Sequence, residues 1–141
     1  MRSLSDAQIR QFLDEDGRTA KLATVAADGQ PHVVPVWYIV DSDEVVVTMS
    51  STTAKGRHLA RDPRVALTVD DERPPFAFVT VRGVATLLHD PPDLLDWTTR
   101  IAARYVPPDD VARLGARFAD IDDLVVRIRP IRAIGWAEVT A

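Results

Sequence analysis

Basic and hydroxyl side chains gather in one segment of an otherwise acidic chain, SSTTAKGRHLAR at residues 50–61. No acidic residue occurs from residue 45 to residue 61. The basic residues of that window are Lys55, Arg57, His58 and Arg61. The hydroxyl residues near it are Thr48, Ser50, Ser51, Thr52 and Thr53. Lys55 falls in the first turn of an expected helix, where the helix dipole and unpaired N–H groups favour an anion over a cation. These groups together predict a phosphate-binding site.

The same residues also have a plainer interpretation. Thr52 or Thr53 can serve only as a helix N-cap, and the arginines can form a solvated helix face. Against this, Lys21 and Lys55 are the only lysines among 17 basic residues, so Lys55 is not one of many interchangeable surface lysines. The residues alone leave both interpretations open.

No other residues form a recognisable catalytic or metal-binding pattern. The chain has no cysteine, and His32, His58 and His89 lack the spacing of metal ligands, so we expect no metal. Acidic pairs such as Asp122–Asp123 are expected to be solvated turn and cap residues. The catalytic residues therefore stay unknown, and a bound cofactor would have to supply the reactive atom of any enzymatic reaction.

The bulk composition sets the class of protein. A chain of 141 residues with 46% hydrophobic residues predicts one domain, residues 1–141. A net charge of −4 argues against a general nucleic-acid binder. No apolar run approaches the roughly 20 residues that span a bilayer, so we expect no membrane association and a cytoplasmic location.

Periodicity and turn signals predict six strands and four helices. The strands are expected on either side of Asp28–Gly29 within residues 19–40, and at residues 44–50, 64–70, 76–88 and 123–136. The helices are expected within residues 3–17, 53–61, 91–106 and 107–121. Gly83 indicates a bulge, and Pro130 indicates a sheet edge or a bulge. This order predicts a small, mostly β (α+β) antiparallel barrel with helices packed outside.

Three segments, in this order, resemble the pyridoxamine 5'-phosphate oxidase-like split-barrel proteins, which are flavin- and deazaflavin-dependent oxidoreductases. The segments are ATVAADGQPHVVPVWY, VVVTMSSTTAKGRHLARDPRVALTV and FVTVRGVATLL. The resemblance covers about residues 19–88. It implies a six-stranded antiparallel split β-barrel (an FMN-binding split barrel) and a homodimer with cofactor sites at the subunit interface.

The resemblance also implies a set of cofactor-binding residues. The flavin-type ring would be flanked by Pro35, Val36 and Trp37. The third strand and the turn after it would line the cofactor with Thr48, Met49, Ser50 and Ser51. The cofactor phosphate would be held by Lys55, the backbone of Ala54 and Gly56, and Arg57 or His58. The other subunit would contribute Phe76 and Phe78.

Two departures from the family pattern bear on the cofactor. The true pyridoxamine 5'-phosphate oxidases, called the vitamin oxidases below, carry Arg and Lys in the second-strand FMN motif, whereas this chain has the uncharged segment VVPVWY there. Those oxidases also end in an Arg-Leu-x-Pro motif, whereas this chain ends in GWAEVTA. The pattern is more similar to the branch that uses 8-hydroxy-5-deazaflavin, coenzyme F420. The hypothesis is therefore a reductase that passes a hydride from reduced F420 to a small organic acceptor, with water or Tyr38 supplying the proton.

Three alternatives remain. One is an FMN-dependent pyridoxamine 5'-phosphate oxidase-like oxidoreductase on the same fold. Another is a protein that binds a flavin or haem without turnover. The last is a barrel that has lost its cofactor.

Overall fold

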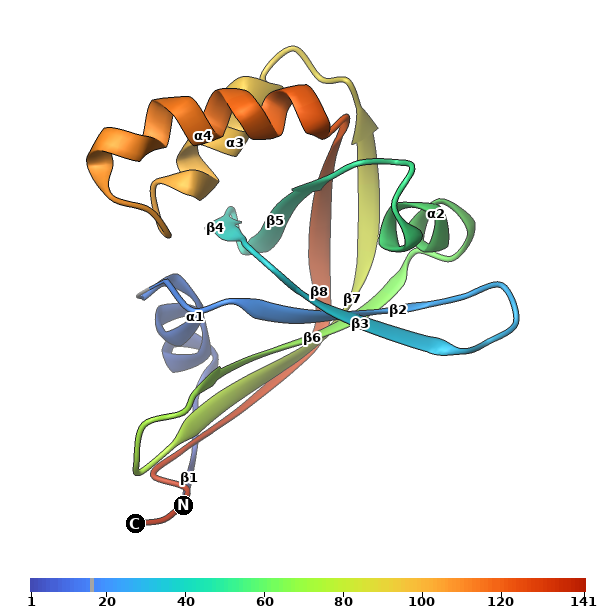
Figure 1. The fold of residues 1–141 in the computed structure, drawn as a ribbon. Helices are drawn as coiled ribbons and strands as arrows, with labels where there is room; N and C mark the ends of the chain where they lie inside the picture. The colour runs from blue at the N-terminus through green and yellow to red at the C-terminus, as the bar shows by residue number, and fades with distance from the viewer. Residues whose placement is uncertain (16) are drawn as a thin grey trace.

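The computed structural model describes residues 1–15 and 17–141, and an antiparallel sheet of eight strands forms its centre (Figure 1). The strands are β1 (Arg2–Ser3), β2 (Ala20–Val25), β3 (Pro31–Val36), β4 (Ile39–Asp41), β5 (Glu44–Met49), β6 (Arg64–Asp71), β7 (Ala77–His89) and β8 (Leu124–Ala137). The helices are α1 (Asp6–Asp14), α2 (Ala54–Arg61), α3 (Leu94–Ala102) and α4 (Pro108–Ile121). The hydrogen-bonded order is β3-β2-β6-β7-β8-β5-β4, and β1 also pairs with β8. The predicted α+β split-barrel class is confirmed.

The sheet has two more strands than the six that were predicted. The run after the first hairpin divides at Trp37 and Tyr38 into β3 and β4, and residues 2–3 pair with β8 as β1. Strands of two and three residues are too short to leave a periodic pattern in the sequence, so only their partners reveal them. The strands at the two ends of the order, β3 and β4, follow each other in the chain.

The two long strands, β7 and β8, run side by side through the molecule and carry the predicted irregularity (Figure 1). Their register shifts between Arg82 and Gly83, and Gly83 pairs with Pro130. A Cβ on Gly83 would lie 2.7 Å from the Arg129 carbonyl oxygen, so the close approach requires glycine. The bulge predicted from Gly83 is confirmed, and of the two alternatives predicted for Pro130 the bulge holds and the sheet edge does not, because β8 lies between β7 and β5.

The helices lie on different sides of the sheet. In Figure 1, the α3–α4 hairpin lies at one end of the molecule, α1 lies beside the sheet, and α2 lies near the β2–β3 hairpin. Trp97 of α3 packs with Val46 and Val125 on the face of β5 and β8 that points away from the main core. The two chain termini lie close together (Figure 1).

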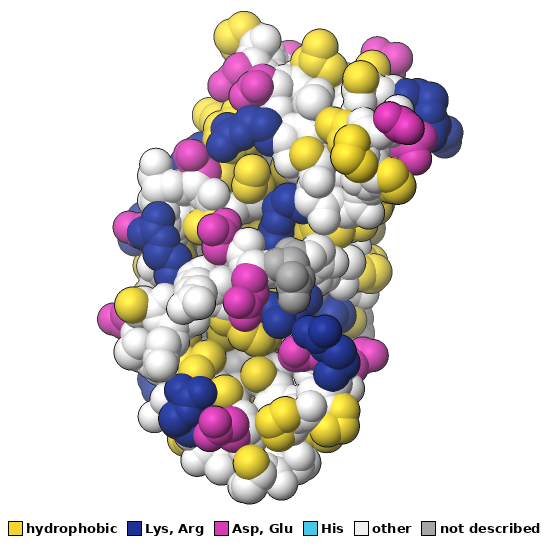
Figure 2. Space-filling view, turned by 90° about the vertical axis from the view of Figure 1, so that its left-hand side faces the viewer, with side chains coloured by type: hydrophobic (Ala, Val, Ile, Leu, Met, Phe, Trp, Pro, Cys, Tyr) yellow, Lys and Arg dark blue, Asp and Glu magenta, His cyan; other side chains and the backbone are white. Residues whose placement is uncertain are grey.

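Charges on the surface are mixed in sign. On the face shown in Figure 2, Lys and Arg side chains stand beside Asp and Glu, with hydrophobic side chains between them. Exposed ion pairs join Arg113 to Asp110 at 3.2 Å and Arg64 to Asp62 at 2.7 Å. Such pairs contribute little to stability, but they neutralise much of the surface locally.

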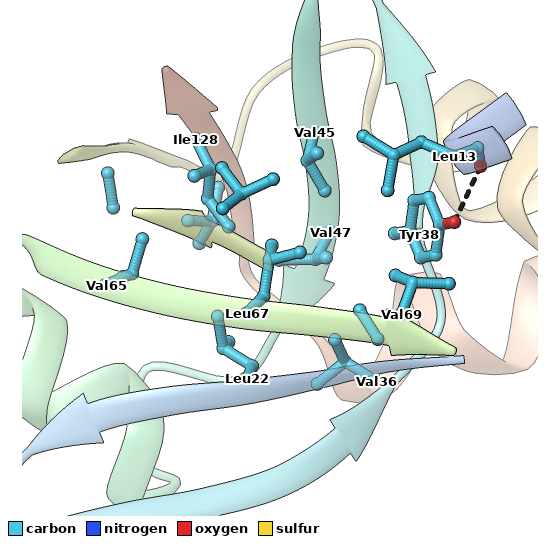
Figure 3. Packing of buried hydrophobic residues seen from close by; sticks show 14 of the residues in the cluster. Leu13, Leu22, Val36, Tyr38, Val45, Val47, Val65, Leu67, Val69 and Ile128 are labelled. Carbon is cyan, nitrogen blue, oxygen red and sulfur yellow. Dashed lines mark hydrogen bonds between the residues drawn. The ribbon is translucent and has the colours of Figure 1, made fainter. Parts of the chain in front are cut away.

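Tyr38 is a buried structural residue. Its side chain is fully buried in the core, and its hydroxyl donates a hydrogen bond of 2.6 Å to the Leu13 carbonyl of α1 (Figure 3). Burial raises the pKa of Tyr38 to about 12. The expectation that Tyr38 might supply a proton to a substrate is therefore wrong, because its hydroxyl does not reach the surface and holds its proton strongly.

The α3–α4 hairpin is fastened to the barrel by polar contacts around Tyr38. The Arg104 guanidinium donates to the carbonyls of Tyr38 and Leu13. The Tyr105 hydroxyl accepts from the Tyr38 N–H at 3.1 Å and donates to the Arg18 carbonyl at 2.9 Å. The bonds to the N–H and carbonyl of Tyr38 satisfy backbone groups where the chain crosses from β3 to β4.

Replacing Tyr38 by Phe tests its structural role. The Leu13 carbonyl would lose one donor but keep Arg104, so we expect the free energy of unfolding to fall by only about 0.5–1.5 kcal/mol. Urea denaturation of both proteins measures the difference. Unchanged stability combined with reduced turnover would instead make Tyr38 a proton donor.

Candidate functional site

The turn between β5 and α2 is held by its own hydroxyl groups. The Thr53 hydroxyl donates to the Ser50 carbonyl at 2.7 Å and accepts from the Gly56 N–H at 3.3 Å, which makes Thr53 the N-cap of α2. The Ser50 and Thr52 hydroxyls lie 2.8 Å apart, and the Thr52 N–H donates to the Ser50 hydroxyl. The turn is therefore a defined loop, and its geometry sets the start of α2.

Gly56 allows α2 to approach this turn closely. The residue is buried, and a Cβ built on it would lie 2.4 Å from the Ser50 carbonyl oxygen and 3.1 Å from the Ser51 Cα. Because both neighbours are backbone atoms, no side-chain movement could make room. The first turn of α2, with Ala54 and Lys55, is thereby pressed against the end of β5.

Lys55 differs from the other basic residues of α2. The Arg57 guanidinium donates to the Thr52 carbonyl, and that of Arg61 donates to the Val25 carbonyl. Within the described residues, the Lys55 ammonium group makes no ion pair and no hydrogen bond, although the side chain is half-buried. The other lysine, Lys21, is paired with Asp70 at 2.8 Å. Lys55 is thus a cation left available beside free N–H groups of a helix start.

His58 faces the β2–β3 hairpin. Its Nδ1 lies 2.9 Å from the Thr24 hydroxyl, and its ring meets His32 edge-on with the centroids 5.1 Å apart. Desolvation, followed by the neighbouring His32 and the arginines of α2, lowers the pKa of His58. The lowered pKa favours a neutral imidazole ring. Of the two side chains predicted to bind the phosphate together with Lys55, His58 is therefore a weaker candidate than Arg57.

Two acidic residues fasten the turn from the other side. The Thr48 hydroxyl donates to the Asp122 carboxylate at 2.8 Å. Asp123 accepts from both the N–H of Ser51, at 2.6 Å, and its hydroxyl, at 2.5 Å. Asp122 does cap the C-terminus of α4, but the expectation that Asp122 and Asp123 are solvated is wrong, because both carboxylates are bound to the hydroxyl segment. A spacing of more than 70 residues hides this contact from the sequence.

The two carboxylates differ in their electrostatics. Burial raises the pKa of Asp122, against the opposing effects of the Thr48 hydrogen bond and the Lys55 charge. Hydrogen bonds from the side chain and backbone of Ser51 lower the pKa of Asp123. Asp123 therefore favours its ionised form as it holds Ser51, whereas Asp122 is a half-buried acid whose pKa is raised.

The predicted ring-flanking and cofactor-lining residues of β3 and β5 divide into two groups. The side chains of Val36 and Met49 belong to the core, so any contact they make with a cofactor is limited to their backbones. Pro35 is exposed. Trp37 stacks on Tyr105 with the ring centroids 4.8 Å apart and the planes 12° apart, so the α3–α4 hairpin fixes its orientation.

Phe76 and Phe78 lie apart from Lys55. Both are in the segment where β6 turns into β7, whereas α2 immediately precedes the opposite end of β6 (Figure 1). A strand of eight residues spans roughly 26 Å, so one chain does not bring these phenylalanines to Lys55. Phe78 pairs with Trp136 on β8, and Phe76 is exposed.

The described residues contain neither a metal-binding cluster nor a membrane-spanning helix. No group of three or more His, Asp or Glu residues among residues 1–15 and 17–141 could hold a metal ion. Within the same ranges, no helix is long and apolar enough to cross a membrane.

Known proteins share the fold and parts of the sequence. Residues 5–136 match the family described as pyridoxamine 5'-phosphate oxidase. A conserved hypothetical protein from Mycobacterium tuberculosis is 29% identical with a TM-score of 0.82, over 96% of this chain and 86% of that one. A structure described as an F420 reductase is 26% identical with a TM-score of 0.68, over 87% of this chain and 94% of that one.

A curated relative gives a shorter match. It is a 5a,11a-dehydrotetracycline/5a,11a-dehydrooxytetracycline reductase from Streptomyces rimosus, 38% identical over 55 residues. The match spans 36% of this chain and 39% of the relative. The family match is far longer and takes in every strand from β2 to β7 and most of β8. The chain therefore belongs to the pyridoxamine 5'-phosphate oxidase family of flavin-dependent oxidoreductases.

Proposed function

We propose that the protein is a coenzyme F420-dependent reductase acting on a small organic acceptor. The observation that carries the proposal is Lys55, an unpaired cation among the described residues, held at the first turn of α2 by the close contact of Gly56 with Ser50. The likeness to a structure described as an F420 reductase, at 26% identity, supports this choice of cofactor. The curated relative supports a reductase, although only about a third of this chain matches it.

The residues around Lys55 fit a phosphate group chemically. They combine one ammonium group, the free N–H groups of Ala54 and Lys55, and the hydroxyls of Ser50 and Thr52, and all of these can donate to phosphate oxygens. Arg57 reaches the same turn through its contact with the Thr52 carbonyl. These groups around Lys55, called the phosphate cradle below, thus supply hydrogen-bond donors and positive charge without a contribution from His58.

The remaining residues would bind and orient the ring. When bound, reduced F420 supplies the hydride, and the protein contributes position and electrostatics. Trp37, held by its stack on Tyr105, and the exposed Pro35 would flank the ring. Tyr38 is buried, so the proton that accompanies the hydride would come from water.

FMN is the second candidate cofactor. The chain belongs to the family described as pyridoxamine 5'-phosphate oxidase, the resemblance of the sequence includes FMN-dependent members, and a terminal phosphate fits the same donors at Lys55. The absence of charge in VVPVWY, where the vitamin oxidases carry basic residues, favours F420 over FMN.

We propose further that the protein works as a homodimer through the outer face of the sheet. This face, opposite the core, carries the exposed Val33 and Ile134, with exposed fractions of 64% and 42%. Paired residues of neighbouring strands form a row on this face: Thr68 of β6 pairs with Lys21 and with Thr80, and Thr80 pairs with Ile134. A second copy seated here would cover the apolar side chains, and its Phe76 and Phe78 would reach the cofactor site that they cannot reach within their own chain.

Replacing Lys55 by Ala tests the phosphate cradle. Loss of one charge-assisted contact should weaken the binding of F420 by about tenfold to a hundredfold, which corresponds to about 1.5–3 kcal/mol. Titration monitored by the absorbance and fluorescence of F420 measures this loss, with FMN titrated in parallel.

Arg10→Ala is the control for this experiment, because Arg10 carries the same charge on α1, away from α2 (Figure 1). Lys21 does not suit as a control, because it lies on the proposed dimer face. If wild type and Lys55→Ala bind F420 with equal affinity, the phosphate-binding role of Lys55 is refuted. Micromolar binding of FMN without binding of F420 would refute the F420 proposal and leave the FMN candidate.

Replacing Ile134 by Glu tests the dimer. A charge in the middle of the proposed interface should reduce the mass measured by light scattering from twice the chain mass to about 15.6 kDa. Binding of F420 should weaken with it, because each site would lose the partner's phenylalanines. Leu95→Glu is the matched control, since Leu95 is 54% exposed on α3. A wild-type protein that is already monomeric would contradict the proposal.

A further inference from the structure

We propose that Asp122 sets the charge of the phosphate that binds at Lys55, favouring a singly charged phosphodiester over a doubly charged phosphomonoester. The inference deepens the proposed function and rests on it. It assigns a role in cofactor choice to a residue outside the segments that carry the family resemblance.

Asp122 lies where it can act on the cradle. It follows α4 directly and precedes β8, and its carboxylate accepts from the Thr48 hydroxyl at 2.8 Å. Thr48 is on β5, two residues before the turn whose Ser50 carbonyl touches Gly56. The charge of Lys55 is close enough to Asp122 to affect its titration, although the two groups form no direct ion pair in the part of the chain that the structure describes.

Among the charged groups around it, Asp122 is the carboxylate that would repel an anion bound at Lys55. Its charged neighbours are Lys55 on α2 and Asp123 beside it. Asp123 is occupied by two hydrogen bonds from Ser51 and lies near His89 at the end of β7. Asp122 has one hydroxyl donor and a half-buried setting, so its charge is poorly screened from a ligand at Lys55.

The phosphate groups of the two candidate cofactors differ in charge. The phosphate of F420 is a diester with one negative charge at any pH near neutrality. The phosphate of FMN is a monoester with about −1.5 to −2 charges at pH 7. One lysine balanced in part by one carboxylate suits the single charge. Each additional negative charge meets the repulsion of Asp122, so the carboxylate lowers the affinity for FMN more than that for F420.

Protonation should modulate this preference. Burial already raises the pKa of Asp122, and a bound phosphate would raise it further by adding negative charge. The rise in the pKa of Asp122 would therefore be larger with FMN than with F420, because the FMN phosphate carries more negative charge. As the pH falls through the pKa of the complex, Asp122 becomes neutral and its discrimination against FMN disappears.

The test compares the affinities for FMN and for F420 in wild type and in Asp122→Asn at pH 7.5. Asparagine keeps an oxygen that can accept from Thr48 but removes the charge. If repulsion by Asp122 weakens binding by about tenfold per unit of ligand charge, the ratio of FMN affinity to F420 affinity should be about threefold to tenfold higher in Asp122→Asn than in wild type. Asp120→Asn is the matched control, because it makes the same change at an exposed position two residues away and should leave the ratio unchanged.

A second variant and a pH series keep the test decisive. Thr48→Val removes a hydrogen bond that lowers the pKa of Asp122, so it should move the rise of the ratio on acidification to a higher pH even if Asp122→Asn folds poorly. As the pH is lowered from 7.5 to 5.5, the ratio of FMN affinity to F420 affinity should rise more in wild type than in Asp122→Asn. The variant lacks the carboxyl of Asp122, so its own rise reports only the protonation of the FMN phosphate.

The outcomes separate the two proposals. If wild type binds at least one cofactor, the ratio changes by less than twofold in Asp122→Asn and Thr48→Val leaves its pH dependence unchanged, the role of Asp122 is refuted and the proposed function stands. If wild type binds neither F420 nor FMN, the proposed function has failed, and this inference fails with it.

Discussion

The hydrogen bonds from the β5–α2 turn to Asp122 and Asp123 are the interaction on which the candidate site depends. They join three segments that are distant in sequence: the end of β5, the start of α2 and the junction of α4 with β8. Because Asp123 binds both the N–H and the hydroxyl of Ser51, the turn cannot rotate without breaking two charge-assisted bonds. Gly56 then holds α2 against the same turn, so the position of Lys55 follows from contacts on either side of it.

This arrangement explains why a lysine can stand at the positive end of a helix. In isolation the helix dipole disfavours a cation in the first turn. Here Asp122, supplied by another part of the chain, offsets part of that repulsion without forming a direct ion pair within the described residues. Within the described residues Lys55 therefore keeps its ammonium group uncommitted, whereas Arg57 and Arg61 are bound to backbone carbonyls. The site combines a positive point charge with a nearby negative one, which makes it sensitive to the charge of its ligand.

Local signals in the sequence predicted much of the fold, and contacts between distant segments account for the rest. The hairpin at Asp28–Gly29 and the bulge at Gly83 each follow from the preferences of a few adjacent residues, and the structure confirms both. The clustering of basic and hydroxyl residues likewise located the turn at Lys55. No local signal distinguishes Asp122 and Asp123 from ordinary acidic turn residues, because their partners are on β5 and in the turn after it. For the same reason the sequence could not show that Tyr105 orients Trp37 or that Tyr38 is sealed in the core.

The distribution of aromatic residues gives a reason for a dimer that is independent of the exposed sheet face. Trp37 is the aromatic residue among the predicted ring-flanking residues, and Tyr105 already covers one face of it. Phe76 and Phe78 lie at the far end of β6 from α2, too distant to enclose a cofactor bound at Lys55. Hydride transfer requires that water be excluded from the ring, and one chain alone supplies few side chains that could do so. A second copy related by a two-fold axis would bring its β6–β7 turn to this open side, so the same symmetry that covers the sheet face would also close the site.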